Sequence, residues 1–290
     1  MKTMSSIKGH KKDDMVFVTH DMGCNTACKN KKDREYWNMY FDTHAHLDDA
    51  AFDEDREEVM RHLQEAGVES VLDPGCDLES SRKAAELAEM YEFVRFAAGF
   101  HPEELKSLTE ESLEAVLSLT GHPKCCAIGE IGLDYYWDDS HKEEQKKLFH
   151  VQLSYAKERD IPVIVHDREA HGDCLAIVKQ YPGLRGVFHC YSGSPEMAQE
   201  LLRMGWYLGF DGPVTYKNAK KALEVLRICP DDRIVVETDS PYLPPVPMRG
   251  KRNDPSNLRY ICAKIAEIKE STIETIAKCT AENGKILFGL

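Results

Sequence analysis

The sequence predicts a (β/α)8 TIM barrel, an α/β domain in which eight parallel strands close into a cylinder inside a ring of helices. Short apolar runs rich in β-branched residues alternate about eight times with longer charged segments of helical period. Histidine, aspartate or glutamate also stands at the end of one apolar run after another. Side chains from the ends of many strands converge only if those strands close into a barrel.

The predicted strands are short, and half of them end in Asp or His, as strands that lead into loops do. The segments between them carry helix start signals. Ser140 precedes the charged run 141–147, and Ser194-Pro195-Glu196 opens another helical segment. The strands are expected at residues 40–46, 69–73, 94–100, 126–131, 162–166, 186–189, 207–210 and 233–237.

An open, doubly wound sheet is the alternative that strict alternation leaves. Such a sheet gathers its site at one switch point, usually at a glycine-rich first turn. The turn after Asp42-Thr43-His44-Ala45-His46 has no G-x-G-x-x-G pattern, and Gly129-x-x-Gly132 alone is too weak a match to indicate a nucleotide-binding fold. The barrel is therefore the predicted architecture, with its site at the carboxyl-terminal face.

The composition is that of an ordinary globular protein that can bury a sizeable core. The chain has 290 residues, of which 42% are hydrophobic and 30% are charged. Lysine and arginine together number 37, against 50 for aspartate and glutamate, so the formal net charge is −13. This charge opposes broad electrostatic capture of nucleic acid, and any such substrate must be held locally.

No targeting signal stands out in the sequence. The start of the chain is polar, and the longest apolar runs are far shorter than the ~20 residues of a membrane helix. The ten cysteines are scattered, without the pattern of a disulfide framework. We expect a cytoplasmic protein with reduced thiols, no membrane association and no obligate protein partner.

Residues 1–39 stand apart as a lysine-rich N-terminal extension, and the barrel domain is expected to span residues 40–290. The extension contains His20, Cys24 and Cys28, which could chelate a metal. Lys31 occupies the place of the third cysteine in a C-x3-C-x2-C cluster motif. The favoured interpretation is therefore a poorly ordered tail.

Six residues in or near strand ends are candidate metal ligands. His44 and His46 are two positions apart, so on a strand they face the same side, as a chelating pair must. A lone histidine at a strand end is more often a structural residue, but here histidines and acids end several strands. This donor set suits zinc, manganese, iron or cobalt better than calcium, and magnesium is compatible with the acids. The predicted ligands are His44, His46, Glu130, His166, His189 and Asp239.

Six motifs, arranged in order within residues 40–290, resemble those of the TatD-type metal-dependent deoxyribonucleases in the amidohydrolase superfamily. The resemblance implies a (β/α)8 barrel, a binuclear or larger metal site and hydrolysis of DNA phosphodiesters, often as a 3′-to-5′ exonuclease. It also implies that His44, His46 and Asp239 hold one metal ion. The motifs are FDTHAHL (41–47), GFHP (99–102), GEIGLDY (129–135), VHDREA (165–170), FHCYSG (188–193) and ETDSPYL (237–243).

The residue that bridges the two ions distinguishes a TatD-like deoxyribonuclease from other amidohydrolases. By the same resemblance, His166 and His189 hold the second ion and Glu130 bridges the pair. Several amidohydrolases that cut C–N or ester bonds use a carboxylated lysine as the bridge, whereas Glu130 brings its charge without modification. Some lactonase-like relatives also use glutamate, so a hydrolase of an amide, a lactone or an aminoacyl ester is the alternative. A non-catalytic scaffold, the third class, has no need of such a ring of ligands.

The expected mechanism is activation of water by two divalent ions, such as magnesium, manganese or zinc. Glu130 takes part as the bridging residue. Asp239 is the expected acceptor of the proton that the water loses, although it could be a ligand only. The role of Glu237, two positions earlier, is left open between an orienting residue, an extra ligand and a barrel-lining acid.

Contacts to DNA are expected on the catalytic face. The basic loop at residues 249–255 follows the last strand of an acidic protein and resembles the arginine-bearing segment of the family at that place. Guanidinium groups there could take phosphate in a bidentate manner, whereas the alternative is a solvated loop. The candidates for substrate contact are His101, Arg168, Arg249, Lys251 and Arg252, and the aromatic residues that could either stack on a base or simply pack are Tyr136, Trp137 and Tyr242.

Overall fold

The computed structural model describes residues 39–137 and 140–290, so the predicted extension lies outside the described residues except for Met39. Within them, each strand pairs in parallel with the next strand along the chain. Repeated right-handed βα units produce this order. The strands are β1 (Tyr40–Asp42), β2 (Val68–Pro74), β3 (Val94–Ala98), β4 (Cys125–Asp134), β5 (Val163–Arg168), β6 (Gly186–Phe188), β7 (Tyr207–Phe210) and β8 (Ile234–Val236).

The sheet closes on itself because the chain segments that follow β1 and β8 bond to each other. The Thr43 amide donates to the Val236 carbonyl at 3.1 Å. Further along both segments, the Asp239 amide donates to the His44 carbonyl at 2.9 Å. The predicted (β/α)8 barrel is therefore confirmed.

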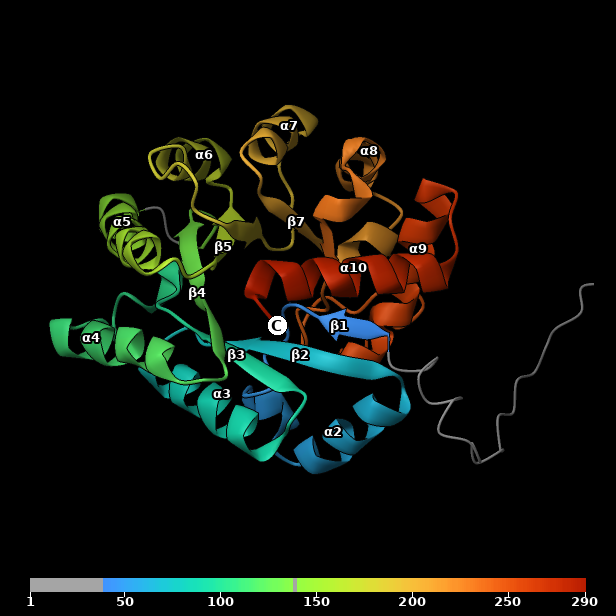
Figure 1. The fold of residues 1–290 in the computed structure, drawn as a ribbon, viewed down its shortest axis with the longest axis horizontal. Coiled ribbons are helices and arrows are strands. Elements are labelled where there is room, and N and C mark those ends of the chain that lie inside the picture. Colours follow the sequence, from blue (N-terminus) through green and yellow to red (C-terminus); the bar gives the residue numbers. More distant parts are fainter. Residues whose placement is uncertain (1–38, 138–139) are drawn as a thin grey trace, which may run out of the picture.

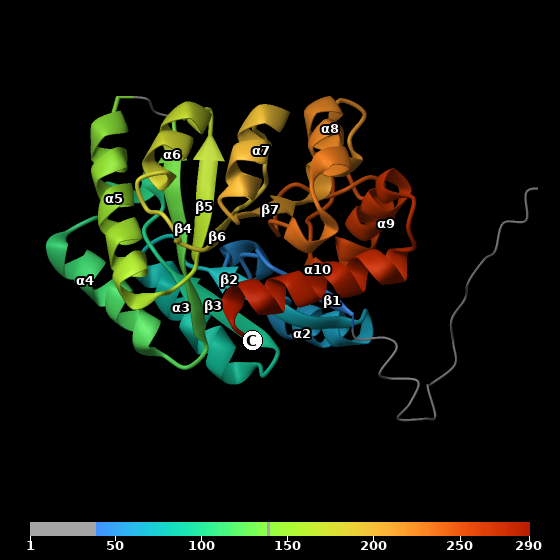
Figure 2. The same ribbon diagram turned by 45° about the horizontal axis from the view of Figure 1, so that its top comes forward.

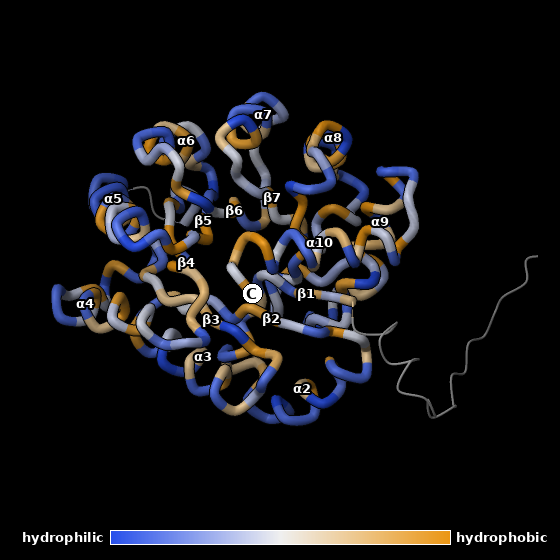
Figure 3. Tube along the Cα trace, viewed as in Figure 1, coloured by the Kyte–Doolittle hydropathy of each residue, from blue (hydrophilic) through white to orange (hydrophobic). Residues whose placement is uncertain are grey.

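Helices surround the barrel (Figure 1), and in Figure 3 they carry both hydrophilic and hydrophobic stretches, as helices that cover a sheet do. Ser194 caps α7 by accepting a bond from the Met197 amide, as its start signal predicts. None of the helices in the described ranges has the length and apolar character needed to cross a bilayer. The helices are α2 (Arg56–Glu65), α3 (Leu78–Met90), α4 (Glu110–Ser118), α5 (Lys142–Arg159), α6 (His171–Val178), α7 (Pro195–Arg203), α8 (Lys220–Ile228), α9 (Leu258–Lys269) and α10 (Ile273–Phe288), with short 3-10 helices at Ala50–Phe52, Pro102–Glu104, Leu119–Gly121, Gly212–Thr215, Asp231–Arg233 and Pro255–Asn257.

A layer of apolar side chains fills the lower part of the barrel. Phe41, Ile164 and Val235 come from three different strands and are fully buried in it. Helix α10 crosses the ring of strands (Figures 1 and 2), and its residues Leu287 and Phe288 belong to the same cluster. The Phe41 and Phe288 rings meet edge to face with centroids 6.1 Å apart. This end of the barrel is sealed by hydrophobic contact, which leaves the other end for polar groups.

The next inward layer is polar. Side chains alternate along a strand, so the residue two positions after an inward apolar residue also faces inward. His166 follows Ile164 in this way, and Glu237 follows Val235. Gly209 makes room for the acid, because a Cβ atom there would lie 2.5 Å from both carboxylate oxygens of Glu237. The strands thus direct polar side chains to the carboxyl-terminal end of the barrel.

The largest departures from the predicted strand ends are in β1 and β4. Strand β1 ends at Asp42 instead of His46, because the chain beyond it pairs with the segment after β8. Strand β4 continues past Ile131 to Asp134. Its pairing with β5 shifts register between Ile128 and Ile131, an irregularity of the kind that redirects side chains next to active sites.

Asp42 and Thr238 join β1 to the end of β8 through their side chains. Asp42 Oδ1 accepts bonds from the amides of His44 at 3.2 Å and Thr238 at 3.0 Å. Its Oδ2 accepts a bond from the Thr238 hydroxyl at 2.6 Å. All three residues are fully buried, so these bonds fix the backbone on both sides of the closure.

Replacing Thr238 by valine should lower the free energy of unfolding by about 1–3 kcal/mol, because it removes the hydroxyl and leaves Asp42 buried with one donor fewer. Chemical denaturation measures this loss. Thr238→Ser, which keeps the hydroxyl, is the control and should lose less stability. Equal stability of the valine variant and the parent would contradict this role of the pair.

Candidate metal centre

Two histidines and an aspartate form a first donor group (His44, His46 and Asp239) where the chain segments after β1 and β8 meet. The Nε2 atoms of His44 and His46 are 3.2 Å apart. Asp239 Oδ1 lies 3.7 Å from the former and 3.6 Å from the latter. Asp239 has a φ of 54°, in the left-handed region that aspartate tolerates better than most residues. The three side chains expected to hold one ion therefore lie together.

Glu130 stands between this group and a second donor group (His166 and His189). Its Oε2 is 3.3 Å from His44 Nε2. Its Oε1 is 2.7 Å from both His166 Nδ1 and His189 Nε2, which are 3.2 Å from each other. Each oxygen of Glu130 thus faces a different donor group, as a carboxylate between two cations would.

The spacing of the nitrogen atoms fits divalent cations. Ligand atoms that share one tetrahedral zinc ion at 2.0–2.1 Å lie about 3.3 Å from each other. The His44–His46 pair and the His166–His189 pair both have nitrogen atoms 3.2 Å apart. Nitrogens that face each other so closely cannot both carry a proton, and a shared cation would satisfy both lone pairs.

The ionisation of two of the donors, Glu130 and His44, also suits a cation. Burial alone would raise the pKa of Glu130, but the imidazoles of His189, His101 and His44 hold it well below its usual range. Burial, reinforced by His189, lowers the pKa of His44 to about 4. At neutral pH the carboxylate is charged and this imidazole is neutral, which are the forms that bind metal.

Asp134, at the end of β4, positions His166. Its Oδ2 is 3.0 Å from His166 Nε2, and its Oδ1 accepts bonds from the amides of Tyr136 at 2.8 Å and Trp137 at 3.3 Å. Burial would lower the pKa of His166, but the hydrogen bonds to Asp134 and Glu130 raise it to about 10. Because the Nε2 atom of His166 bonds to Asp134, its Nδ1 atom is the nitrogen that faces Glu130 and His189.

Glu237, whose role the sequence left open, lies behind His189. Its Oε1 accepts a bond from the Cys190 amide and is 3.9 Å from His189 Nδ1, and its Oε2 accepts a bond from the Thr43 hydroxyl at 3.4 Å. Burial raises the pKa of Glu237 well above its usual value. These contacts favour a residue that fixes the backbone next to His189, through the Cys190 amide, over a further ligand.

His101, a candidate for phosphate contact, lies beside Glu130 and the second donor group. Its Nδ1 accepts a bond from the Glu103 amide at 3.2 Å, which turns Nε2 toward Glu130 Oε1 at 3.6 Å. The ring is 7% exposed, and its centroid is 4.4 Å from that of His166. His101 can therefore donate to Glu130 or add a nitrogen to the second donor group.

Arg168 and two of the predicted aromatic residues form one assembly at the ends of β4 and β5. The guanidinium carbon lies 4.1 Å from the ring centroid of Tyr136 and 5.2 Å from that of Trp137. Tyr136 is 55% exposed and Trp137 is 63% exposed, so both rings are accessible. The third predicted aromatic, Tyr242, is likewise exposed. It lies next to the first donor group, with its ring centroid 6.2 Å from that of His46.

The two arginines of the basic loop are in different situations. Arg252 makes a bidentate pair with Asp55, with distances of 2.8 and 2.6 Å. Its guanidinium fork is thus already occupied, which favours a role in holding the loop. Arg249 instead lies over the ring of Tyr216 at 4.1 Å and is exposed.

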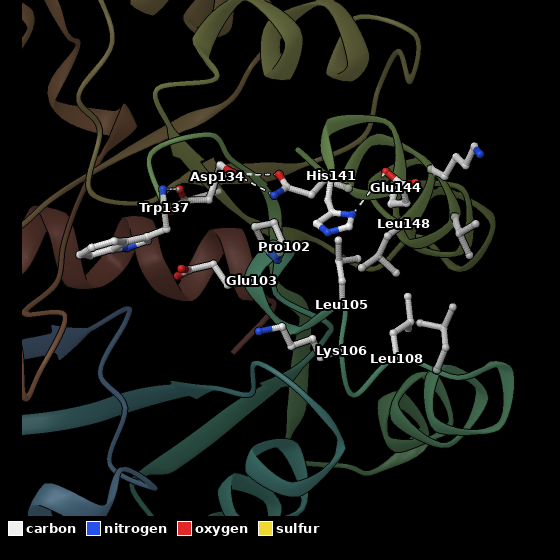
Figure 4. A pocket seen from close by; sticks show the side chains of 14 residues that line it. Pro102, Glu103, Leu105, Lys106, Leu108, Asp134, Trp137, His141, Glu144 and Leu148 are labelled. Carbon is white, nitrogen blue, oxygen red and sulfur yellow. Dashed lines mark hydrogen bonds and ion pairs between the residues drawn. The ribbon is translucent and has the colours of Figure 1, made fainter. Parts of the chain in front are cut away.

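A cleft of about 770 Å³ lies next to the 3-10 helix Pro102–Glu104 (Figure 4). Asp134, which bonds to His166, is in its wall, and Trp137 is at one side. Most of the remaining wall next to the 3-10 helix Pro102–Glu104 is apolar, and it includes Leu105, Leu108 and Leu148.

The sequence analysis did not single out Asp134, Cys76, Asp48 or Asp73. The signal for Asp134 was its position four residues after Glu130, on the same face of an extended strand. Cys76 follows the end of β2, a strand without a predicted ligand, and its sulfur lies 4.0 Å from Glu130 Oε2. Asp48 and Asp73 are buried next to the first donor group.

Replacing Asp134 by alanine should weaken metal binding roughly 10–100-fold, because His166 loses the carboxylate that fixes its ring and its tautomer. Equilibrium dialysis with elemental analysis measures this effect. Asp173→Ala is the matched control, since Asp173 bonds to Tyr135 and Lys146 outside the donor cluster. Unchanged metal affinity in the Asp134 variant would rule out the positioning role.

Comparison with known proteins identifies the family. The family model described as TatD related DNase matches residues 41–289. The uncharacterized metal-dependent hydrolase YabD of Bacillus subtilis is 46% identical over 252 residues, covering 86% of this chain and 99% of YabD. The 3′-5′ ssDNA/RNA exonuclease TatD of Citrobacter koseri is 34% identical, with coverages of 86% and 99%. The crystal structure of the TatD homolog YjjV from Escherichia coli K12 superimposes with a TM-score of 0.82 at 32% identity, covering 87% of this chain and 99% of YjjV. The chain therefore belongs to the TatD-related DNase family of metal-dependent hydrolases.

Proposed function

We propose that this chain hydrolyses phosphodiester bonds of DNA from the 3′ end, with two divalent ions such as magnesium, manganese or zinc. The first and second donor groups each hold one ion, and Glu130 lies between them. The observation that carries this proposal is the placement of Glu130, whose two oxygens face the two groups separately. Membership of a family that includes a 3′-5′ exonuclease supports the substrate.

The residues of the site handle the proton of the attacking water. When bound, two divalent ions make hydroxide available at neutral pH and neutralise charge at the phosphate. Burial would raise the pKa of Asp239, but its hydrogen bond to His46 and the charges of His44 and His189 lower it. Asp239 is thus a carboxylate at neutral pH. Because Oδ1 faces the histidines, Oδ2 is the oxygen that takes the proton.

Recognition of DNA rests on local contacts in this proposal. Arg168 supplies a positive charge held against two aromatic rings, and those rings offer exposed faces on which a base can stack. The cleft beside Trp137 gives an unpaired base a place to lie next to Asp134, the hydrogen-bond partner of His166 (Figure 4). Single-stranded ends match this arrangement better than the interior of a duplex.

The proposed location is the cytoplasm. The eight cysteines in the described part of the chain are all free thiols. Free thiols are the expected state of cysteine in a reducing compartment.

The direct test incubates the protein with end-labelled single-stranded and double-stranded DNA in magnesium, manganese or zinc. We expect stepwise shortening from the 3′ end of single strands. Glu130→Gln should reduce this activity by about 100-fold or more. Removal of a residue that only hydrogen-bonds to a metal ligand typically costs roughly 10–100-fold, and Glu130 is itself a proposed ligand. Glu196→Gln, on the exposed surface of α7, is the control. No cleavage of DNA by the parent protein, together with turnover of a lactone or amide panel, would favour the alternative hydrolase.

Separate neutralisation of Arg168 and Arg249 should raise KM for single-stranded DNA and flatten its salt dependence, by a slope of about 0.7 per lost phosphate contact. A small chromogenic phosphodiester should be hydrolysed at nearly the parental rate, since activation of water does not use these side chains. Arg252→Ala is the comparison variant. It should lower the melting temperature, because it breaks the pair with Asp55, and should change KM less than the other two variants do. A loss of turnover on the small substrate would show instead that the arginine acts in the transition state.

A further inference from the structure

Cys76 brings a sulfur atom to the edge of the proposed metal centre. It follows β2, and its Sγ lies 4.0 Å from Glu130 Oε2. Donor atoms of His46, Cys76 and Glu130 all lie within 4.8 Å of one another. Of the eight cysteines in residues 39–137 and 140–290, Cys76 alone joins such a group of metal-ligand side chains.

Main-chain hydrogen bonds fix the position of the Cys76 backbone. The Cys76 amide donates to Ser80 Oγ at 2.8 Å, and the Cys76 carbonyl accepts from the His101 amide at 2.8 Å. The carbonyl of the preceding residue, Gly75, accepts from the Glu130 amide at 2.8 Å. Cys76 and Glu130 are thus held in register by main-chain bonds, so the closeness of their side chains does not depend on a mobile loop.

We propose that Cys76 is a sulfur ligand of the ion held by the first donor group, and that this thiolate makes the site prefer zinc, cobalt or iron(II) over magnesium. A sulfur ligand about 2.3 Å and an oxygen ligand about 2.0 Å from one zinc ion lie about 3.5 Å apart when the angle between them is about 110°. The observed 4.0 Å needs a shift of about half an ångström to reach this value.

The chemistry of the donor explains the preference. Coordination converts the Cys76 thiol to a thiolate that gives an electron pair to the cation, and the released proton passes to solvent. Thiolate is a soft donor that binds zinc and other borderline ions well, whereas magnesium favours carboxylate and water oxygens. The imidazoles of the centre already favour such ions, and the thiolate of Cys76 would strengthen that preference over magnesium.

Cobalt(II) substitution of the full chain tests this inference, which rests on the proposed metal centre and not on its substrate. The parent protein should show visible d–d bands together with a near-ultraviolet charge-transfer band from thiolate to cobalt. Cys76→Ser should lose the charge-transfer band and keep the d–d bands. The same variant should bind zinc at least about tenfold more weakly, because loss of a ligand should cost no less than loss of a residue that only hydrogen-bonds to a ligand. Its affinity for magnesium should change little.

Two controls assign the sulfur. Cys125→Ser changes a thiol that bonds to the Ala127 carbonyl outside the donor groups. The double change of Cys24 and Cys28 to serine removes the two cysteines of the N-terminal extension that could chelate a metal. Both variants should keep the full charge-transfer band. Visible bands without any charge-transfer band in the parent, or a full band in Cys76→Ser, would overturn the role of Cys76. Absence of every cobalt band in the parent would overturn the metal centre itself.

Discussion

Closure of the sheet between β8 and β1 is the constraint on which the whole centre depends. Neighbouring strands are ~4.8 Å apart, so β1 and β8 at the two edges of a flat eight-stranded sheet would be separated by about 34 Å. In the barrel, Asp239 Oδ1 lies 3.7 Å from His44 Nε2. The main-chain bonds after β1 and β8, reinforced by Asp42 and Thr238, account for this difference. The first donor group exists only because the closure holds.

Burial of Glu130 then gives a physical reason why the proposed centre would bind cations. An isolated carboxylate taken out of water costs several kcal/mol, and the cost is offset only by opposite charge or by strong hydrogen bonds. Glu130 is 3% exposed, and the Asp134 and Asp239 carboxylates lie close by among imidazoles. Protonated histidines offset part of this charge in the metal-free chain. Divalent ions would offset it more fully and would free the imidazole nitrogens to act as ligands.

The barrel and its ring of strand-end ligands could be predicted from the sequence because alternation of elements and position at a strand end are local properties. Other features arise from contacts between distant residues. The pairing of Arg252 with Asp55 joins positions 197 residues apart, and the proximity of Cys76 to Glu130 depends on a main-chain bond across β3. The register shift in β4 is likewise set by the partner strand. No local pattern in the sequence indicates these features.

An acidic chain can act on a polyanion if recognition is confined to the rim of the site. At physiological ionic strength charges more than about 8 Å apart are largely screened, so the net charge of −13 matters less than the groups in contact with the substrate. Arg168 is held against Tyr136 and Trp137, which reduces the freedom it must lose on binding phosphate. Stacking on these rings requires a base that is not already stacked in a duplex. In the proposed function, the same geometry that would let an acidic protein hold DNA would therefore favour unpaired ends as its substrate.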